Sequence, residues 1–124
     1  MISQGPAKKV TIYVNEDTQR HFNSLYESIL QFLMNKGVSG ATATRALAGF
    51  GAHGVLHTPK IEVLAEHLPI RVEFVDTAAK VDELLPTLYE MVTDGLIEIA
   101  GATVYRGILG YGAKGHTHKQ SFFT

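Results

Sequence analysis

The chain has 124 residues, of which 45% are hydrophobic and 19% charged, a normal composition for a single globular domain. Its formal net charge of -1 disfavours binding to nucleic acid or to an anionic membrane surface. The absence of cysteine excludes disulfides, thiolate catalysis and cysteine-ligated metal sites. Residues 1–7 lack the apolar region of a signal peptide, and no apolar run is long enough to span a membrane. We therefore expect a cytoplasmic protein without membrane insertion.

The first half of the chain predicts a strand, a helix and a second strand after a short tail at residues 1–7. β-Branched and aromatic residues alternate between two faces at 9–14, which predicts the first strand. Apolar residues then recur at helical spacing until glycines end the pattern. The residues of this helical stripe are Phe22, Leu25, Tyr26, Ile29, Leu30 and Leu33. Residues 41–48 predict the second strand, and residues 49–68 predict a long glycine-hinged hairpin extension.

The second half predicts the same order of elements. Residues 69–75 alternate between apolar and polar side chains and predict the third strand, which a second helix follows. Pro86 falls inside that helix, so we expect a kink or a restart there. Residues 96–105 predict a fourth strand that is broken or bulged at Gly101.

The element order β-α-β, long loop, β-α-β predicts an α+β fold, the ferredoxin-like split βαβ sandwich (βαββαβ). In this fold an antiparallel four-stranded sheet carries both helices on one face, here with an extended loop between the second and third strands. The opposite face would hold Thr11, Tyr13, Arg71 and Glu73. This set is too mixed for a monomer core and contains an aromatic ring, so we expect that face to pack against other subunits.

One motif occurs twice. Residues 40–54 recur 61 residues later at 101–115, with eight of fifteen positions identical. The same offset aligns residues 10–14 with 71–75, which predicts two pseudo-symmetric halves. Each copy places an arginine before a glycine-rich loop with an aromatic residue between glycines. Main-chain N–H groups of such loops can approach an anion closely, and a guanidinium adds charge and a bidentate fit.

These two loops supply candidate ligand-binding residues. They are Arg45, Gly49, Phe50, Gly51 and His53 in the first copy, and Arg106, Gly110, Gly112 and Lys114 in the second. The aromatic ring of Phe50 could stack on a base or seal the site. The alternative is that the glycines only permit tight turns, while the arginines pair with carboxylates such as Glu73.

Histidines form two close pairs, His53 with His57 and His116 with His118. Such pairs could ligate zinc or copper with the help of carboxylates or of a neighbouring subunit. The alternative is that these histidines are solvated side chains of loops. The sequence therefore does not decide which residues would bind a metal. The serines have no base at catalytic spacing, so the sequence predicts no enzyme.

Several segments together point to one family. They are Val10-Thr-Ile-Tyr-Val14, Leu25-Tyr26-Glu27, the block from Gly40 to Gly51, His57-Thr58, Leu68-Pro69-Ile70, Val75-Asp76-Thr77, Leu85-Pro86 and Met91-Val92. In these segments the chain resembles the PII-like group, specifically the domain-of-unknown-function 190 family. The resemblance covers residues 8–106 as one domain. It leaves residues 107–124 as a glycine-rich C-terminal extension that the family pattern does not predict.

The resemblance implies a ferredoxin-like fold assembled as a homotrimer that binds adenine nucleotides in clefts between subunits. PII proteins close the phosphate site with a glycine-rich turn after the second helix, and the shorter turn at 93–96, with Gly95, is its counterpart here. The resemblance also implies signalling through the 49–68 loop to a protein partner, such as a membrane transporter. We thus expect a trimeric regulatory protein that binds a small anionic metabolite and requires no cofactor. The alternative is a divalent-metal-binding trimer like CutA, a protein of related architecture.

Overall fold

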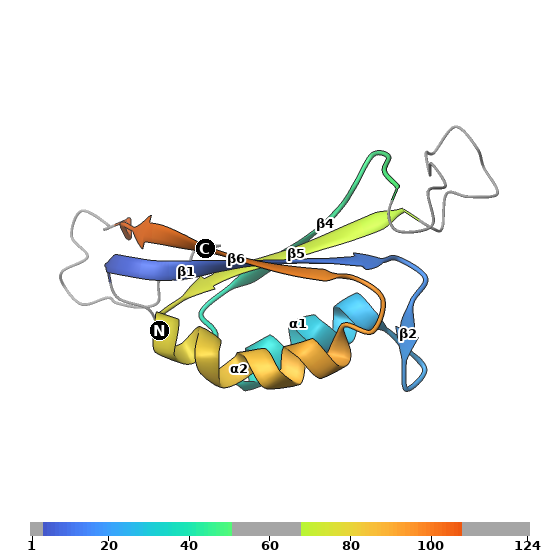
Figure 1. Ribbon diagram of the computed structural model, residues 1–124, viewed down its shortest axis with the longest axis horizontal. Coiled ribbons are helices and arrows are strands. Elements are labelled where there is room, and N and C mark those ends of the chain that lie inside the picture. The colour runs from blue at the N-terminus through green and yellow to red at the C-terminus, as the bar shows by residue number, and fades with distance from the viewer. Residues whose placement is uncertain (1–3, 51–67, 108–124) are drawn as a thin grey trace.

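Two helices cover one face of a four-stranded antiparallel sheet in the computed structural model, which describes residues 4–50 and 68–107 (Figure 1). The strand order is β4-β5-β1-β6, and β2 and β3 form a small separate hairpin. The elements are β1 (Gly5–Asn15), β2 (Gln19–Arg20), β3 (Asn23–Ser24), α1 (Leu25–Asn35), β4 (Ala41–Arg45), β5 (Pro69–Asp76), α2 (Ala78–Met91) and β6 (Leu96–Val104). The ferredoxin-like split βαβ sandwich that the sequence predicts is therefore confirmed.

The core lies between the two helices and the sheet face that they cover. Every second residue of β1 and β5 points to the helices, and the register pairs Val10 with Phe74 and Ile12 with Val72. The helices add residues at the spacing of one helical face. The buried core consists of Val10, Ile12, Val14, Leu25, Ile29, Leu33, Ile70, Val72, Phe74, Val81, Leu84, Leu88 and Met91. Each buried aliphatic or aromatic side chain contributes about 1.5–3 kcal/mol, so this layer holds the helices on the sheet.

The opposite face of the sheet carries charged and polar side chains. Lys9 Nζ and Arg71 Nε each lie 3.6 Å from Glu73 Oε2, and the Thr11 hydroxyl donates to the same oxygen at 3.5 Å. Tyr13 lies directly across from Arg71 in the β1–β5 pair and is 37% exposed. The set of side chains predicted for this face is therefore present on it.

Strand β1 is longer than the sequence predicts, and strand β6 is continuous. β1 begins at Gly5, so residues 5–7 belong to the sheet and not to a tail. Gly101 pairs with Lys8 inside a continuous β6, so the predicted break at this glycine is wrong. The strand continues through a glycine because the ladder bonds come from the main chain, and every residue except proline can both donate and accept.

Helix α1 begins at Leu25, later than the predicted helical stripe, which started at Phe22. The preceding residues form the β2–β3 hairpin, in which His21 and Phe22 make the two-residue turn with φ values of 51° and 73°. Positive φ at both central residues is the type I′ geometry, which suits the twist of a tight hairpin. Phe22 is 99% exposed and takes no part in the core. Its assignment to the helical stripe is therefore wrong.

Helix α2 runs continuously through Pro86, so the restart expected at this proline does not occur. The Thr77 hydroxyl oxygen accepts a hydrogen bond from Lys80 N at 3.1 Å and caps the helix. Pro86 is exposed, so water can reach the part of the helix where the proline removes a main-chain donor. Neither α1 nor α2 is long and apolar enough to cross a membrane.

The 61-residue repeat of the sequence is not a repeat of structure. Its offset maps Val10, which is fully buried against the helices, onto Arg71, which lies on the opposite face beside Tyr13. It also maps Gly40, just before β4, onto Gly101 inside β6. Val10 pairs with Phe74, and Arg71 lies three residues from Phe74 in β5, so Arg71 points to the opposite face. Pseudo-symmetric halves at this offset are therefore a wrong prediction.

Candidate functional site

Part of the candidate site lies at one end of the sheet, where β4 and β1 end and β5 and β6 begin (Figure 1). β4 and β1 run parallel on either side of the antiparallel β5, so Arg45, Ile70 and Val14 stand in one row across three strands. Gly49 and Phe50 follow Arg45 in the chain. We call these three candidate residues, Arg45, Gly49 and Phe50, the Arg45 cluster.

Arg45 forms an ion pair with a carboxylate that immediately follows β1, the parallel strand on the other side of β5. Its Nε and one terminal nitrogen each lie 3.1 Å from Glu16 Oε1. The two side chains are 51% and 27% exposed, so this surface pair contributes only about 0–1 kcal/mol. The carboxylate considered from sequence, Glu73, instead forms ion pairs with Lys9 and Arg71 on the opposite face. The sequence signal for Glu16 is its place immediately after β1, whose end is level with that of β4.

The chain beyond Arg45 stays beside β5. Ala46 N donates to Pro69 O at 2.9 Å, and a Cβ added at Gly49 would lie 3.0 Å from Pro69 Cγ. β4 has ended by then, earlier than the predicted residue 48. Leu47 and Phe50 are 85% and 72% exposed, so two exposed apolar side chains follow the partly exposed Arg45 within five residues of the chain. This combination suits a ligand that has an anionic group and a flat apolar part.

Gly95 lies at the same end of the sheet but on its other edge. It immediately precedes β6, which is three strands away from β4, a lateral distance of about 14 Å. A Cβ at Gly95 would collide with the main-chain oxygen of Tyr13. The close approach of two strands therefore explains this glycine without any ligand.

Arg106 lies at the opposite end of the sheet from Arg45. Its N–H donates to Gln4 Oε1 at 3.3 Å, and the nearby Val104 pairs with Gly5 at the start of β1. The row that contains Arg45 crosses β1 at Val14, nine residues further along, which is about 30 Å of extended strand. One chain therefore does not bring Arg45 and Arg106 to the same small ligand.

The remaining candidates lie outside the described residues: Gly51, His53, Gly110, Gly112 and Lys114. The same holds for the histidines considered as metal ligands, His57, His116 and His118. Within residues 4–50 and 68–107, no group of three or more histidines and carboxylates could hold a metal ion. The metal-binding alternative thus rests on the sequence alone.

Solved structures of similar architecture identify the fold. CPII, a nitrogen regulatory PII-like protein from Thiomonas intermedia bound to ADP, AMP and bicarbonate, superposes with a TM-score of 0.59 at 22% identity. The match covers 84% of this chain and all of that one. A PII-like signalling protein from Thermus thermophilus gives 0.59 at 22% identity, covering 88% of this chain and 94% of that one. The chain therefore has the fold of PII-like signalling proteins.

Sequence relatives define the family. The sequence model of DUF190, described as an uncharacterized ACR, matches residues 7–100 and also 97–124. A UPF0166 protein of Methanocaldococcus jannaschii is 35% identical over 102 residues, which cover 82% of this chain and 94% of that protein. A UPF0166 protein of Aquifex aeolicus is 31% identical over 78 residues, covering 63% and 74%. The chain belongs to the DUF190 (UPF0166) family, as its sequence motifs predict.

The second of the two matches concerns the repeated motif. The match at 7–100 contains the first copy and the match at 97–124 contains the second. The expectation that residues 107–124 lie outside the family pattern is therefore wrong.

Proposed function

We propose that this protein is a trimeric PII-like signalling protein that binds a small anionic metabolite, an adenine nucleotide, at the Arg45 cluster. The observation that carries the proposal is that the Arg45 guanidinium makes a weak surface pair and that the exposed Leu47 and Phe50 follow it within five residues. The ADP and AMP bound to CPII, which shares the fold, support this class of ligand. We propose no catalytic activity and no required cofactor.

Binding at this position would replace one partner of Arg45 by another. A phosphate oxygen can take the place of Glu16 Oε1, and phosphate accepts two parallel N–H bonds from a guanidinium. The exposed ring of Phe50 offers a face on which the base can stack. Because the Glu16 pair is worth little, its loss opposes binding only slightly.

The trimer is supported by the uncovered face of the sheet. This face presents the Lys9–Glu73–Arg71 group together with Tyr13 and with Leu96, which is 59% exposed. Mixed polar and aromatic surface of this kind is common where subunits meet. In such an assembly Arg106 would reach an Arg45 cluster only from a neighbouring chain, since the two lie about 30 Å apart in one chain. Residues 49–68 would then act on a protein partner, for example a transporter.

Two measurements test the proposal. In thermal unfolding with ADP, AMP or ATP, a ligand at a hundred times its Kd should stabilise the wild type by about 2.7 kcal/mol. Arg45→Ala should lose this stabilisation, whereas Lys36→Ala, which removes an exposed cation of the α1 C-terminus, should keep it. Stabilisation by none of the three nucleotides would refute the proposed ligand. Light scattering should give three times the 13.5 kDa chain mass, and a monomer mass would refute the assembly.

A further inference from the structure

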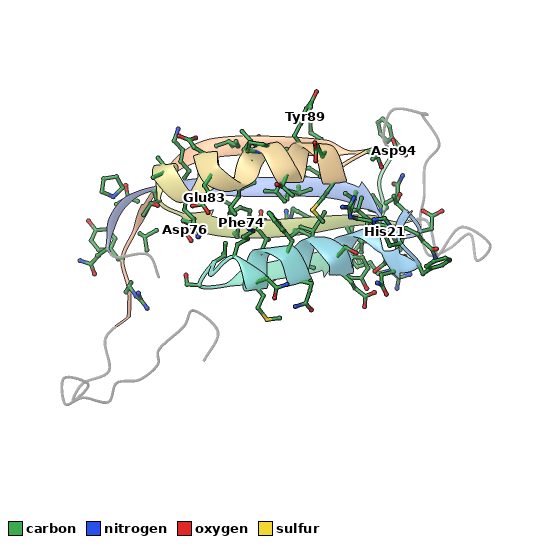
Figure 2. The ribbon with its side chains drawn as sticks, turned by 90° about the horizontal axis from the view of Figure 1, so that it is seen from below. His21, Phe74, Asp76, Glu83, Tyr89 and Asp94 are labelled. Carbon is green, nitrogen blue, oxygen red and sulfur yellow. The ribbon has the colours of Figure 1, made fainter. Side chains whose placement is uncertain are left out.

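A groove opens on the side of the molecule that carries the helices. It has a volume of about 550 Å³ and lies among the β2–β3 hairpin, the outer surface of α1 and the second half of α2. Figure 2 views this side, with His21 marking the hairpin beside α1. Known small-molecule sites have volumes of about 300–1,000 Å³, so the groove has the size of a binding site.

One wall of the groove carries a guanidinium without a carboxylate. Arg20 of β2 is half-buried, and within residues 4–50 and 68–107 no carboxylate pairs with it. Arg45 and Arg71 differ, since each has a carboxylate within 4 Å. A half-buried guanidinium is stabilised when an anion binds to it. Its planar N–H groups can donate two parallel hydrogen bonds to a carboxylate.

A carboxylate lines the same groove from the first turn of α1. Glu27 accepts a hydrogen bond from the Ser24 hydroxyl and makes no ion pair with a described cation. The groove therefore presents one positive and one negative group that do not neutralise each other. A ligand with a carboxylate and an ammonium group close together could pair with Arg20 and with Glu27 at the same time.

The rest of the groove has an apolar part and a neutral polar part. Phe32 and Met91 contribute the apolar part, and Met91 is only 4% exposed. Gln31 Nε2 donates to Asn35 Oδ1 at 3.1 Å, which leaves further donors and acceptors on both amides. A ligand side chain that crosses Phe32 and Met91 would thus meet neutral polar groups.

We propose that this groove binds a free α-amino acid with a polar side chain. Arg20 receives the α-carboxylate through two N–H bonds, and Glu27 receives the α-ammonium. The side chain of the ligand extends along α1 over Phe32 toward Gln31 and Asn35. This site is separate from the Arg45 cluster and does not depend on nucleotide binding.

The direct test is a titration of ¹⁵N-labelled protein with each of the twenty L-amino acids at millimolar concentration. At least one amino acid with a polar side chain should give saturable amide shifts confined to residues 19–35 and 87–91. Its N-acetyl derivative lacks the ammonium and its carboxamide lacks the carboxylate, so each should bind at least about tenfold more weakly. Equal binding of either derivative would overturn the proposal, as would the absence of saturable shifts or their location elsewhere.

Variants locate the two charged contacts. Arg20→Gln and Glu27→Gln should each weaken binding about tenfold or more, and Arg20→Lys should weaken it less than Arg20→Gln. Gln19→Ala on the same hairpin and Asp82→Asn on α2 are exposed controls outside the groove, so affinity should change less than about twofold. Unchanged affinity in both Arg20→Gln and Glu27→Gln would overturn the assignment. Circular dichroism checks that each variant folds. If Arg20→Gln misfolds, the affinity of Arg20→Lys relative to wild type tests the role of Arg20.

Discussion

Gly95 stands so close to the main-chain oxygen of Tyr13 that no side chain fits between them. A Cβ at this position would overlap the Tyr13 oxygen and would also lie 3.0 Å from Val92 Cγ1. The oxygen belongs to β1, the central strand to which β6 pairs from Leu96 onward. The entry of the chain into the last strand therefore depends on glycine at this position.

Gly95→Ala should destabilise the fold by about 2–3 kcal/mol, because the new methyl group forces a backbone shift in β1 or β6. Urea unfolding at equilibrium measures this change in the free energy of unfolding. Gly101→Ala is the matched control, since a Cβ there has nothing within 4 Å. That variant should change stability by less than about 1 kcal/mol. Equal losses in the two variants would contradict the role given to the Tyr13 contact.

The turn of the β2–β3 hairpin offers a gain in stability. His21 and Phe22 both have positive φ, which is unfavourable by about 1–2 kcal/mol per non-glycine residue, while asparagine and glycine accept this turn readily. The double substitution His21→Asn, Phe22→Gly should therefore raise the free energy of unfolding by about 1–2 kcal/mol. Thermal unfolding followed by circular dichroism measures the gain.

The control for this turn is Phe22→Ala, which removes the exposed ring and keeps the strained backbone. It should leave the free energy of unfolding nearly unchanged, since Phe22 is 99% exposed. A marked loss of stability in Phe22→Ala would show that the ring makes contacts beyond this chain.

If a nucleotide binds at Arg45 as proposed, Glu16 competes with it for the guanidinium. Glu16→Gln should change the free energy of unfolding by less than about 1 kcal/mol, because the pair lies at the surface. The same substitution should tighten nucleotide binding, since it removes both the competing partner and a negative charge near the phosphate. Calorimetric titration with ADP compares the variant with wild type, and Glu90→Gln on the exposed surface of α2 is the charge control. Weaker ADP binding in Glu16→Gln would contradict the competition.

Glu73 is the centre of charge on the uncovered sheet face. Glu73→Lys would place three cations together, because Lys9 and Arg71 both lie 3.6 Å from the present carboxylate. If this face joins subunits, the repulsion should shift the assembly toward monomers at micromolar concentration. Light scattering measures the mass, and Glu83→Lys on α2 is the control for charge reversal away from the sheet. An unchanged trimer in Glu73→Lys would remove this face from the interface.

The sequence predicts the elements that have a strong period. Alternation at 10–14 and 70–74 and the helical stripes of α1 and α2 identify the core, because these patterns admit one buried face each. The sequence does not predict the hairpin before α1, because Phe22 continues the helical spacing by chance. Backbone torsions at His21 and Phe22, which sequence periodicity does not report, decide where the helix begins.

The candidate site divides in the same way. Arg45, Gly49 and Phe50 are neighbours in the chain, so the motif alone predicts that they lie together. Glu16 reaches Arg45 only because β4 and β1 end level with each other across β5.

The sequence by itself determined the family, the layered fold and the residues that fill its core. Only the tertiary structure decided where the arginines of the two motif copies lie. The pairing of Val10 with Phe74 puts Arg71 on the opposite face of the sheet, and the register of β6 on β1 carries Arg106 to the far end from Arg45. Strand register depends on pairing between residues distant in the chain, so sequence likeness between the copies could not determine it.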